Sequence, residues 1–171
     1  IAMTPDKEQE YLGVLASETT RLSGLINNVL ELARLEKKNR PLTIVQGDIK
    51  EVFSEVETVM QAKLNQEGFT LEHAVTGVGS FAFDREVLVQ VLMNLMENSI
   101  KFGRSVATKK IRLEAEQLEG EVEIRVVDSG PGVAKAELKK IFNDFYRVDN
   151  SMTRATGGTG IGLALVKKFI N

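Results

Sequence analysis

The chain has 171 residues, of which 43% are apolar and 27% charged, with 1 histidine and 0 cysteines. These fractions are ordinary for a soluble domain and exclude a disordered tail, a collagen-like fibre and a disulfide-stapled miniprotein. Without cysteine there is no thiolate metal site and no cysteine nucleophile, and a formal net charge of −2 gives no reason to expect a nucleic-acid partner. No stretch reaches the roughly 18 consecutive apolar residues that a membrane span needs.

The first part of the chain, residues 6–38, carries one long helical pattern. Leu15, Leu22 and Val29 recur every seven residues, and further leucines make the apolar stripe too broad for a solvated surface helix. Such a helix needs partner helices to be stable. Two interpretations stay open: the helix packs on its own domain, or it is half of a dimerising helical hairpin whose other half is missing.

The rest of the chain, residues 41–171, alternates between strand and helix patterns. Asp48 and Asp84 each precede a helical pattern, as an N-cap residue does. Because these patterns lack βαβ regularity, we predict an α+β fold: a two-layer α/β sandwich, with a mixed sheet and helices on one face, preceded by one long helix. Strands are expected at 42–45, 69–75, 81–83, 110–116 and 121–127, and helices at 48–68, 84–102, 135–145 and 161–170.

The helix after Asp84 carries a polar stripe. At about 100° per residue, Asn94, Asn98 and Lys101 share one side, and Glu97 lies at its edge. Asparagine is a poor helix former, so two of them one turn apart need a reason. Amide oxygens can complete a Mg²⁺ shell of phosphate oxygens and water, and lysine supplies a point charge for phosphate. A merely polar helix face is the alternative.

A tight turn follows the last predicted strand. The strand ends in Asp128, and glycines stand at 130 and 132. A carboxylate in this place can accept a hydrogen bond from an exocyclic amine, while the glycines let a flat ring approach the backbone. A turn whose aspartate caps its own loop is the alternative.

The last predicted helix opens on a glycine-rich run: Gly157, Gly158, Thr159, Gly160, Ile161, Gly162 and Leu163. Backbone N–H groups at such a helix start bind anions. No Gly-Lys-Ser/Thr follows, which excludes a Walker A loop. Residues 150–156 are not a strand pattern, which excludes a dinucleotide fingerprint. Another kind of phosphate site is implied.

Taken in chain order, these three elements resemble the N, G1 and G2 boxes of the Bergerat ATP-binding fold. Residues 141–149, Ile-Phe-Asn-Asp-Phe-Tyr-Arg-Val-Asp, resemble the F box of sensor histidine kinases. Residues 18–36 are similar to the second helix of the histidine kinase dimerisation domain. The resemblance divides the chain into a partial dimerisation helix, 1–40, and an ATP-binding catalytic domain, 41–171, without the C-terminal hairpin usual in the family.

The resemblance also implies roles for individual residues. Asn98 is expected to be the Mg²⁺ ligand, and Asp128 to bond the adenine amino group. The catalytic residues implied are Asn98, Lys101 and Arg147, with Glu97 as a weaker candidate. The nucleotide-binding residues implied are Asn94, Asn98, Lys101, Asp128, Gly130, Gly132, Tyr146, Arg147, Gly158, Thr159, Gly160, Gly162 and Leu163.

A protein of this kind binds Mg·ATP, releases ADP and transfers the γ-phosphoryl group to a histidine on a dimerisation domain. The acceptor histidine of the family would lie before Ile1, so we expect a fragment that does not phosphorylate itself. The implied partners are a second copy through the N-terminal helix, the histidine-bearing dimerisation domain and a response regulator receiver domain. The implied location is the cytoplasm, including the cytoplasmic part of a membrane-anchored sensor.

Two other functions remain open: an ATP hydrolase of the same superfamily and a non-catalytic nucleotide-binding signalling module. The hydrolases typically carry a glutamate four residues before the metal asparagine, where this chain has Asn94, which cannot act as a general base. The boxes also depart from the family at Ser99, where alanine is usual, and at Ser129. His73 lies outside the matched boxes and is expected to be structural.

Overall fold

The structure is a computed structural model that describes residues 5–36, 41–148 and 158–170. The chain divides into two compact units, Ile1–Arg40 and Pro41–Asn171. The described part of the first unit is one helix, α1 (Pro5–Glu36), as its period predicted. Leu15, Leu22 and Ile26 are each more than half exposed on it. No helix in the described part of the chain is long and apolar enough to span a membrane.

The strands of the second unit form two sheets. Strands β2 (Thr70–Thr76), β4 (Lys110–Leu118) and β5 (Glu121–Asp128) form a three-stranded sheet in the order β2-β4-β5. The β2–β4 pair is parallel and the β4–β5 pair antiparallel, so the predicted mixed sheet is confirmed. Strands β1 (Ile44–Gly47) and β3 (Phe81–Asp84) pair separately, and β1 begins two residues later than predicted.

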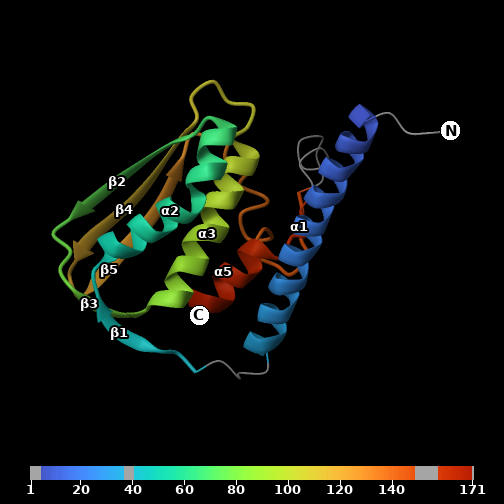
Figure 1. Cartoon of the computed structure of the whole chain (residues 1–171). Helices are drawn as coiled ribbons and strands as arrows, with labels where there is room; N and C mark the ends of the chain where they lie inside the picture. The colour runs from blue at the N-terminus through green and yellow to red at the C-terminus, as the bar shows by residue number, and fades with distance from the viewer. Residues whose placement is uncertain (1–4, 37–40, 149–157, 171) are drawn as a thin grey trace. The chain divides into compact units, whose positions relative to one another are not determined.

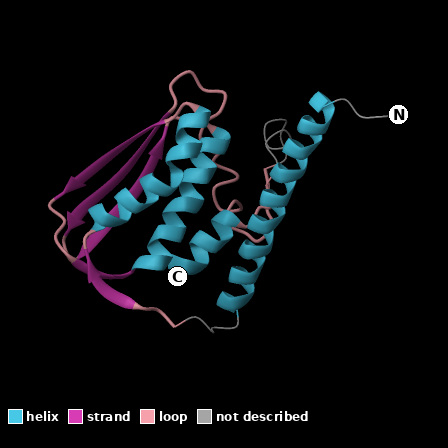
Figure 2. Cartoon of the chain, in the orientation of Figure 1, coloured by secondary structure: helices cyan, strands magenta, loops and turns pink. Residues whose placement is uncertain are grey.

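Three helices complete this unit: α2 (Ile49–Glu67), α3 (Arg85–Phe102) and α5 (Gly162–Ile170). Figure 1 shows α2 and α3 on one face of the three-stranded sheet, with α5 against α3. The same two layers, helices and strands, are separated by colour in Figure 2. This arrangement confirms the predicted sandwich with its helices on one face.

The core fixes the position of α3. Phe53 of α2, Leu92 and Met96 of α3, and Ile111 of β4 are almost completely buried in one cluster. At the start of α3, the Asp84 carboxylate accepts hydrogen bonds from the Val87 N–H at 3.0 Å and the Thr43 N–H at 2.8 Å. The apolar side of α3 therefore faces the sheet, and its polar stripe lies at the edge of the core.

The helix predicted at 135–145 is wrong. The structure has a series of turns there, with hydrogen bonds from the Lys140 N–H to the Glu137 carbonyl at 2.8 Å and from the Asn143 N–H to the Lys140 carbonyl at 2.9 Å. These bonds span three residues rather than the four of an α-helix, and a single bond of helical spacing, from the Ile141 N–H to the Glu137 carbonyl at 3.0 Å, is not continued by a second one. The segment ends at Phe145, whose φ of 60° belongs to the left-handed region. The Tyr146 hydroxyl donates to the Glu137 carboxylate and folds the segment on itself.

Candidate functional site

The glycine run lies directly on the polar stripe of α3. A methyl group placed on Gly162 would lie 3.2 Å from the Asn94 Oδ1 and 3.9 Å from the Asn98 Nδ2. A methyl group on Gly158 would lie 2.2 Å from the Lys101 Nζ. The structure therefore brings together two of the predicted motifs, with glycines opposite the amides and the ammonium group. Gly157, the first residue of the run, lies outside the described residues.

A second contact joins the glycine run to the turn segment. Gly160 has a φ of 73°, and a methyl group on it would lie 2.8 Å from the carbonyl carbon of Phe145 and 2.8 Å from the carbonyl oxygen of Tyr146. The same segment also contacts the last helix, because the Lys168 Nζ of α5 lies 3.1 Å from the Asp144 Oδ2. Residues 144–146 are thus held against both the glycine run and the last helix.

The surroundings of Lys101 disfavour the positive charge of its side chain. Burial lowers the pKa of its ammonium group, and the positive charges of Arg147 and Arg104 lower it further, against a smaller opposing effect of Glu97. The Nζ also lies 4.8 Å from the centre of the Phe102 ring. A partly buried cation with two cationic neighbours is stabilised by an anion, so this end of the site suits a phosphate group.

At the end of β5, both oxygens of the Asp128 carboxylate accept hydrogen bonds. Its Oδ1 accepts from the Gly130 N–H at 2.7 Å, and its Oδ2 accepts from the Ser99 hydroxyl of α3 at 3.0 Å. The next residue fastens the turn to β4, because the Ser129 Oγ accepts from the Lys110 N–H at 3.1 Å. The aspartate turn is therefore tied to α3, which also carries the polar stripe.

The structure gives each glycine of this turn a local reason to be glycine. A methyl group on Gly130 would lie 2.7 Å from the Oδ1 of Asp128, so a side chain there would displace the carboxylate. Gly132 has a φ of 72°, which favours glycine whatever the surroundings. The prediction that both glycines make room for a flat ring is separate from these local reasons.

The contact between Ser99 and Asp128 is not predicted from the sequence, where Ser99 is only a departure from the family pattern. A polar residue on the apolar side of α3 is the signal that points to it. The serine is 7% exposed and stands next to Ile100, which is completely buried. Its partner lies 29 residues away in the sequence, so only the tertiary structure identifies it.

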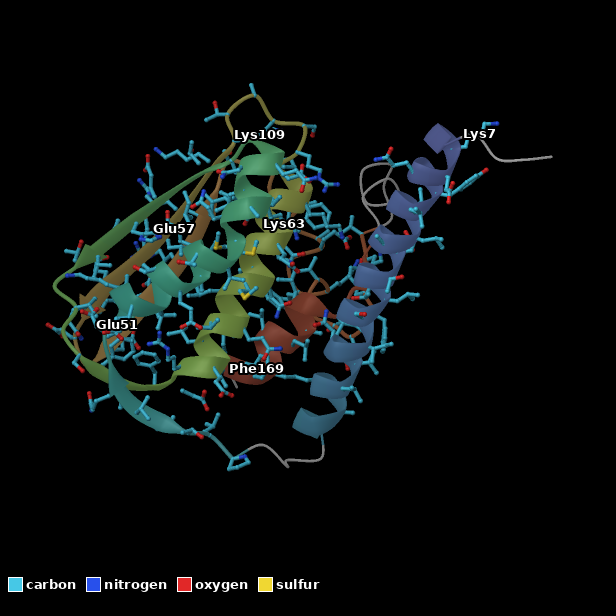
Figure 3. All side chains as sticks on the ribbon, viewed as in Figure 1. Lys7, Glu51, Glu57, Lys63, Lys109 and Phe169 are labelled. Atoms are coloured by element: carbon cyan, nitrogen blue, oxygen red, sulfur yellow. The ribbon has the colours of Figure 1, made fainter. Side chains whose placement is uncertain are left out.

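The remaining predicted residues border these contacts or lie apart from them. The Thr159 Oγ1 accepts from the Ile161 N–H at 3.3 Å at the start of α5, and Leu163 is half-buried on that helix. Tyr146 is half-buried, and its hydrogen bond to Glu137 raises the pKa of its hydroxyl. Glu97 faces α2 instead, where its Oε1 lies 3.0 Å from the Nζ of Lys63, labelled in Figure 3.

No group of three or more His, Cys, Asp or Glu side chains that could hold a metal ion occurs among residues 5–36, 41–148 and 158–170. A metal ion at the polar stripe would therefore depend on amide oxygen together with ligand oxygens, as Asn98 can offer. His73 lies on β2, where its Nε2 is 3.5 Å from the Oε2 of Glu57, also labelled in Figure 3, and its ring packs on Phe53. Asp149, the last residue of the predicted F box, lies outside the described residues.

Known proteins are similar to this chain in sequence and in fold. A family model described as "Histidine kinase-, DNA gyrase B-, and HSP90-like ATPase" matches residues 83–171, just over half of the chain. The sensor-like histidine kinase SenX3 of Mycolicibacterium smegmatis is 33% identical over 164 residues, which are 95% of this chain and 42% of that protein.

Two solved structures extend the comparison. Full-length ShkA in complex with AMPPNP matches with a TM-score of 0.80 at 28% identity, over 99% of this chain and 34% of that chain. The histidine kinase ThkA in complex with the response regulator protein TrrA matches with a TM-score of 0.69 at 24% identity, over 85% of this chain and 42% of that chain. The chain thus spans less than half the length of each of these three proteins.

Proposed function

Because the chain belongs to the family of histidine kinase-, DNA gyrase B- and HSP90-like ATPases, we propose that it is the catalytic domain of a sensor histidine kinase. In this proposal it binds Mg·ATP and presents the γ-phosphoryl group to a histidine on a dimerisation domain. Residues 41–171 form the catalytic domain, and residues 1–40 contribute one helix of the dimerisation domain.

One observation carries the proposal: the glycine run lies on the polar stripe of α3, with Gly158 against the Lys101 ammonium group and Gly162 against Asn94 and Asn98. Glycine-rich backbone at the start of α5 offers N–H donors, and Lys101 offers a positive charge whose pKa is already lowered by burial. A polyphosphate chain can accept hydrogen bonds from these N–H groups and can also neutralise the charge of Lys101. We assign Asn94, Lys101 and Arg147 to the phosphates and Asn98 to Mg²⁺, which would neutralise phosphate charge.

The adenine end of the site is assigned to Asp128. Its carboxylate is fixed by two donors, and each oxygen keeps a further lone-pair site for the exocyclic amine of adenine. Gly130 and Gly132 shape the turn that carries it, while Tyr146, Thr159 and Leu163 border the phosphate end. A guanine base presents a carbonyl oxygen where adenine has its amine, so the carboxylate would reject it.

The hydrolase alternative is disfavoured by Asn94. Its Nδ2 donates to the Gln90 carbonyl at 3.0 Å, and its Oδ1 would lie 3.2 Å from a methyl group placed on Gly162. An amide cannot remove a proton from water, whereas phosphoryl transfer to an imidazole needs mainly positioning and charge neutralisation. Asn98, Lys101 and Arg147 can supply these, and a role for Glu97 would require it to leave Lys63.

The first test is a calorimetric titration of the chain with Mg·ADP and Mg·GDP, repeated with Asp128→Asn. The exposed residue Glu119, in the turn between β4 and β5, provides the control Glu119→Gln. We expect ADP affinity to fall about 10- to 100-fold in Asp128→Asn, as for loss of a hydrogen bond to a charged group, and to stay unchanged in the control. Equal affinity of the wild type for ADP and GDP would refute the assignment of Asp128.

The second test is phosphotransfer to a separately supplied dimerisation domain that carries the acceptor histidine. We expect slow transfer, because tethering normally raises the effective concentration of the acceptor. Arg147→Ala should reduce transfer more than it reduces ADP affinity, since its proposed partner is the γ-phosphate that ADP lacks. Labelling of His73 in this chain, or full transfer without Arg147, would contradict the mechanism.

The proposed protein partners follow from α1 and from the relatives. Leu15, Leu22 and Ile26 are exposed on α1, and we assign them to contact with a second copy of the chain. A receiver domain is the proposed final phosphate acceptor, in line with the complex formed by ThkA. We further propose that the protein works in the cytoplasm.

A further inference from the structure

Ser99 is a buried polar side chain in the interior of α3. Among the described residues, the buried polar or charged ones are Asp84, at 9% exposed, and Ser99, at 7%. Asp84 caps α3 through the Val87 N–H. Ser99 lies inside the same helix, where serine gains nothing over alanine and burying its hydroxyl costs free energy unless the hydroxyl is bonded.

The single proton of the Ser99 hydroxyl has two acceptors within reach. The Oγ lies 3.1 Å from the Leu95 carbonyl oxygen and 3.0 Å from the Oδ2 of Asp128. The Leu95 carbonyl already accepts the Ser99 N–H as the helical partner four residues away. A carboxylate is the stronger acceptor, because hydrogen bonds to ionised groups are about twice as strong as neutral ones. The proton therefore belongs to Asp128.

The carboxylate of Asp128 is then held from two directions. Gly130, in its own turn, donates to Oδ1, and Ser99, in α3, donates to Oδ2. The first bond is local and fixes the turn alone. The second joins the turn to the helix that carries Asn94, Asn98 and Lys101, and so sets the base end of the site relative to its phosphate end.

We propose that Ser99 is a positioning residue for adenine recognition, which acts by holding the Asp128 carboxylate in the orientation that accepts the exocyclic amine. The inference rests on the proposed function, since it takes Asp128 to be the base-reading residue. Its effect is preorganisation: without the serine hydroxyl, the carboxylate has to be ordered when the ligand binds. The hydroxyl should therefore influence ligands that carry the amine and not ligands that lack it.

The experiment compares Ser99→Ala with the wild type in titrations of Mg·ADP and of Mg·purine riboside diphosphate, which lacks the amine. Thr58→Ala is the matched control, because the Thr58 hydroxyl donates to the Ser54 carbonyl four residues back on α2 without a carboxylate partner. We expect Ser99→Ala to lower the affinity for ADP about threefold to tenfold, which is the range for the loss of one hydrogen bond. The affinity for the analogue should change less than twofold in Ser99→Ala, and Thr58→Ala should change the affinity for neither ligand.

A double-mutant cycle excludes a purely structural role. In the Asp128→Asn background, Ser99→Ala should cause no further loss of ADP affinity, and circular dichroism should show folded protein in every variant. Equal loss for ADP and the analogue, or full additivity with Asp128→Asn, would overturn the role of Ser99. Wild-type protein that binds ADP and the analogue alike would instead refute the assignment of Asp128, which belongs to the proposed function.

Discussion

Gly160 offers the sharpest test of how the glycine run and residues 145–146 fit together. Two separate costs face Gly160→Ala. Its φ of 73° lies in the left-handed region, where a residue with a side chain loses roughly 1–2 kcal/mol relative to glycine. Its new methyl group would also lie 2.8 Å from backbone atoms of Phe145 and Tyr146, which cannot turn aside as a flexible side chain can.

The chain contains a control that separates the two costs. Gly120, in the turn between β4 and β5, has a φ of 80°, and a methyl group on it would meet nothing within 4 Å. Gly120→Ala therefore measures the backbone cost alone, about 1–2 kcal/mol. Gly160→Ala should cost this amount and about 1–3 kcal/mol more, the range for an overpacked site.

Thermal unfolding of the two variants gives the measurement. For a chain of this size, about 1 kcal/mol lowers Tm by roughly 2–4 °C, so the two variants should differ by several degrees. ADP titration adds a second measurement, because displacement of residues 145–146 would disturb the phosphate end of the site. Equal Tm losses and equal ADP affinities in the two variants would refute the contact described between Gly160 and this segment.

Three further predictions concern other parts of the molecule. Asn98→Ala should abolish Mg²⁺-dependent phosphotransfer while circular dichroism stays that of the wild type, and an active variant would show that the metal is assigned to the wrong residue. Glu97→Gln should leave transfer within about threefold of the wild type, since the carboxylate is already bonded to Lys63; a loss as large as that of Asn98→Ala would restore Glu97 as a catalytic residue. Light scattering should show association that increases with concentration and is lost in Leu22→Asp, whereas a strict monomer at high concentration would contradict dimerisation through α1.

Local signals in the sequence were enough for the elements that frame the site. Asp84 marks the start of α3, and the apolar period of the following residues predicts that the helix ends near Phe102. Gly68 ends α2 in the left-handed conformation, with a φ of 75°. The order of polar stripe, aspartate turn and glycine run then identifies the family, although none of the three is specific alone.

Tertiary contacts decide what the sequence left open. Residues 135–145 have the composition of a helix, but the bond from Tyr146 to Glu137 and the left-handed Phe145 favour turns. The contact between Ser99 and Asp128 joins a helix to a strand end, and no periodic pattern in the sequence predicts it. The fit of Gly158 against Lys101 likewise depends on how α5 packs on α3.

Lys101 connects the stability of the chain to ligand binding. Its pKa is lowered in the folded protein, first by burial and then by Arg147 and Arg104, whereas the unfolded chain keeps the ordinary value near 10.5. Between the two values the unfolded state binds more protons, so the free energy of unfolding rises with pH through that window. At neutral pH the charged lysine therefore disfavours the folded state in the absence of a ligand.

Lys101→Met should consequently raise Tm at pH 7 and lower the affinity for ADP. A lysine with a purely structural role would not give this combination. Lys139→Met, at an exposed position in the turn segment, controls for the added apolar side chain. Bound phosphate should raise the pKa of Lys101 again, so ADP binding should take up protons at alkaline pH, between the lowered pKa of the free protein and the higher pKa of the complex. ADP affinity should fall as pH rises through the same window. This proton uptake is measurable by titration calorimetry in buffers of different ionisation enthalpy, and it should vanish in Lys101→Met. A destabilised Lys101→Met variant that binds ADP like the wild type would show that the charge of Lys101 serves the fold rather than the phosphates.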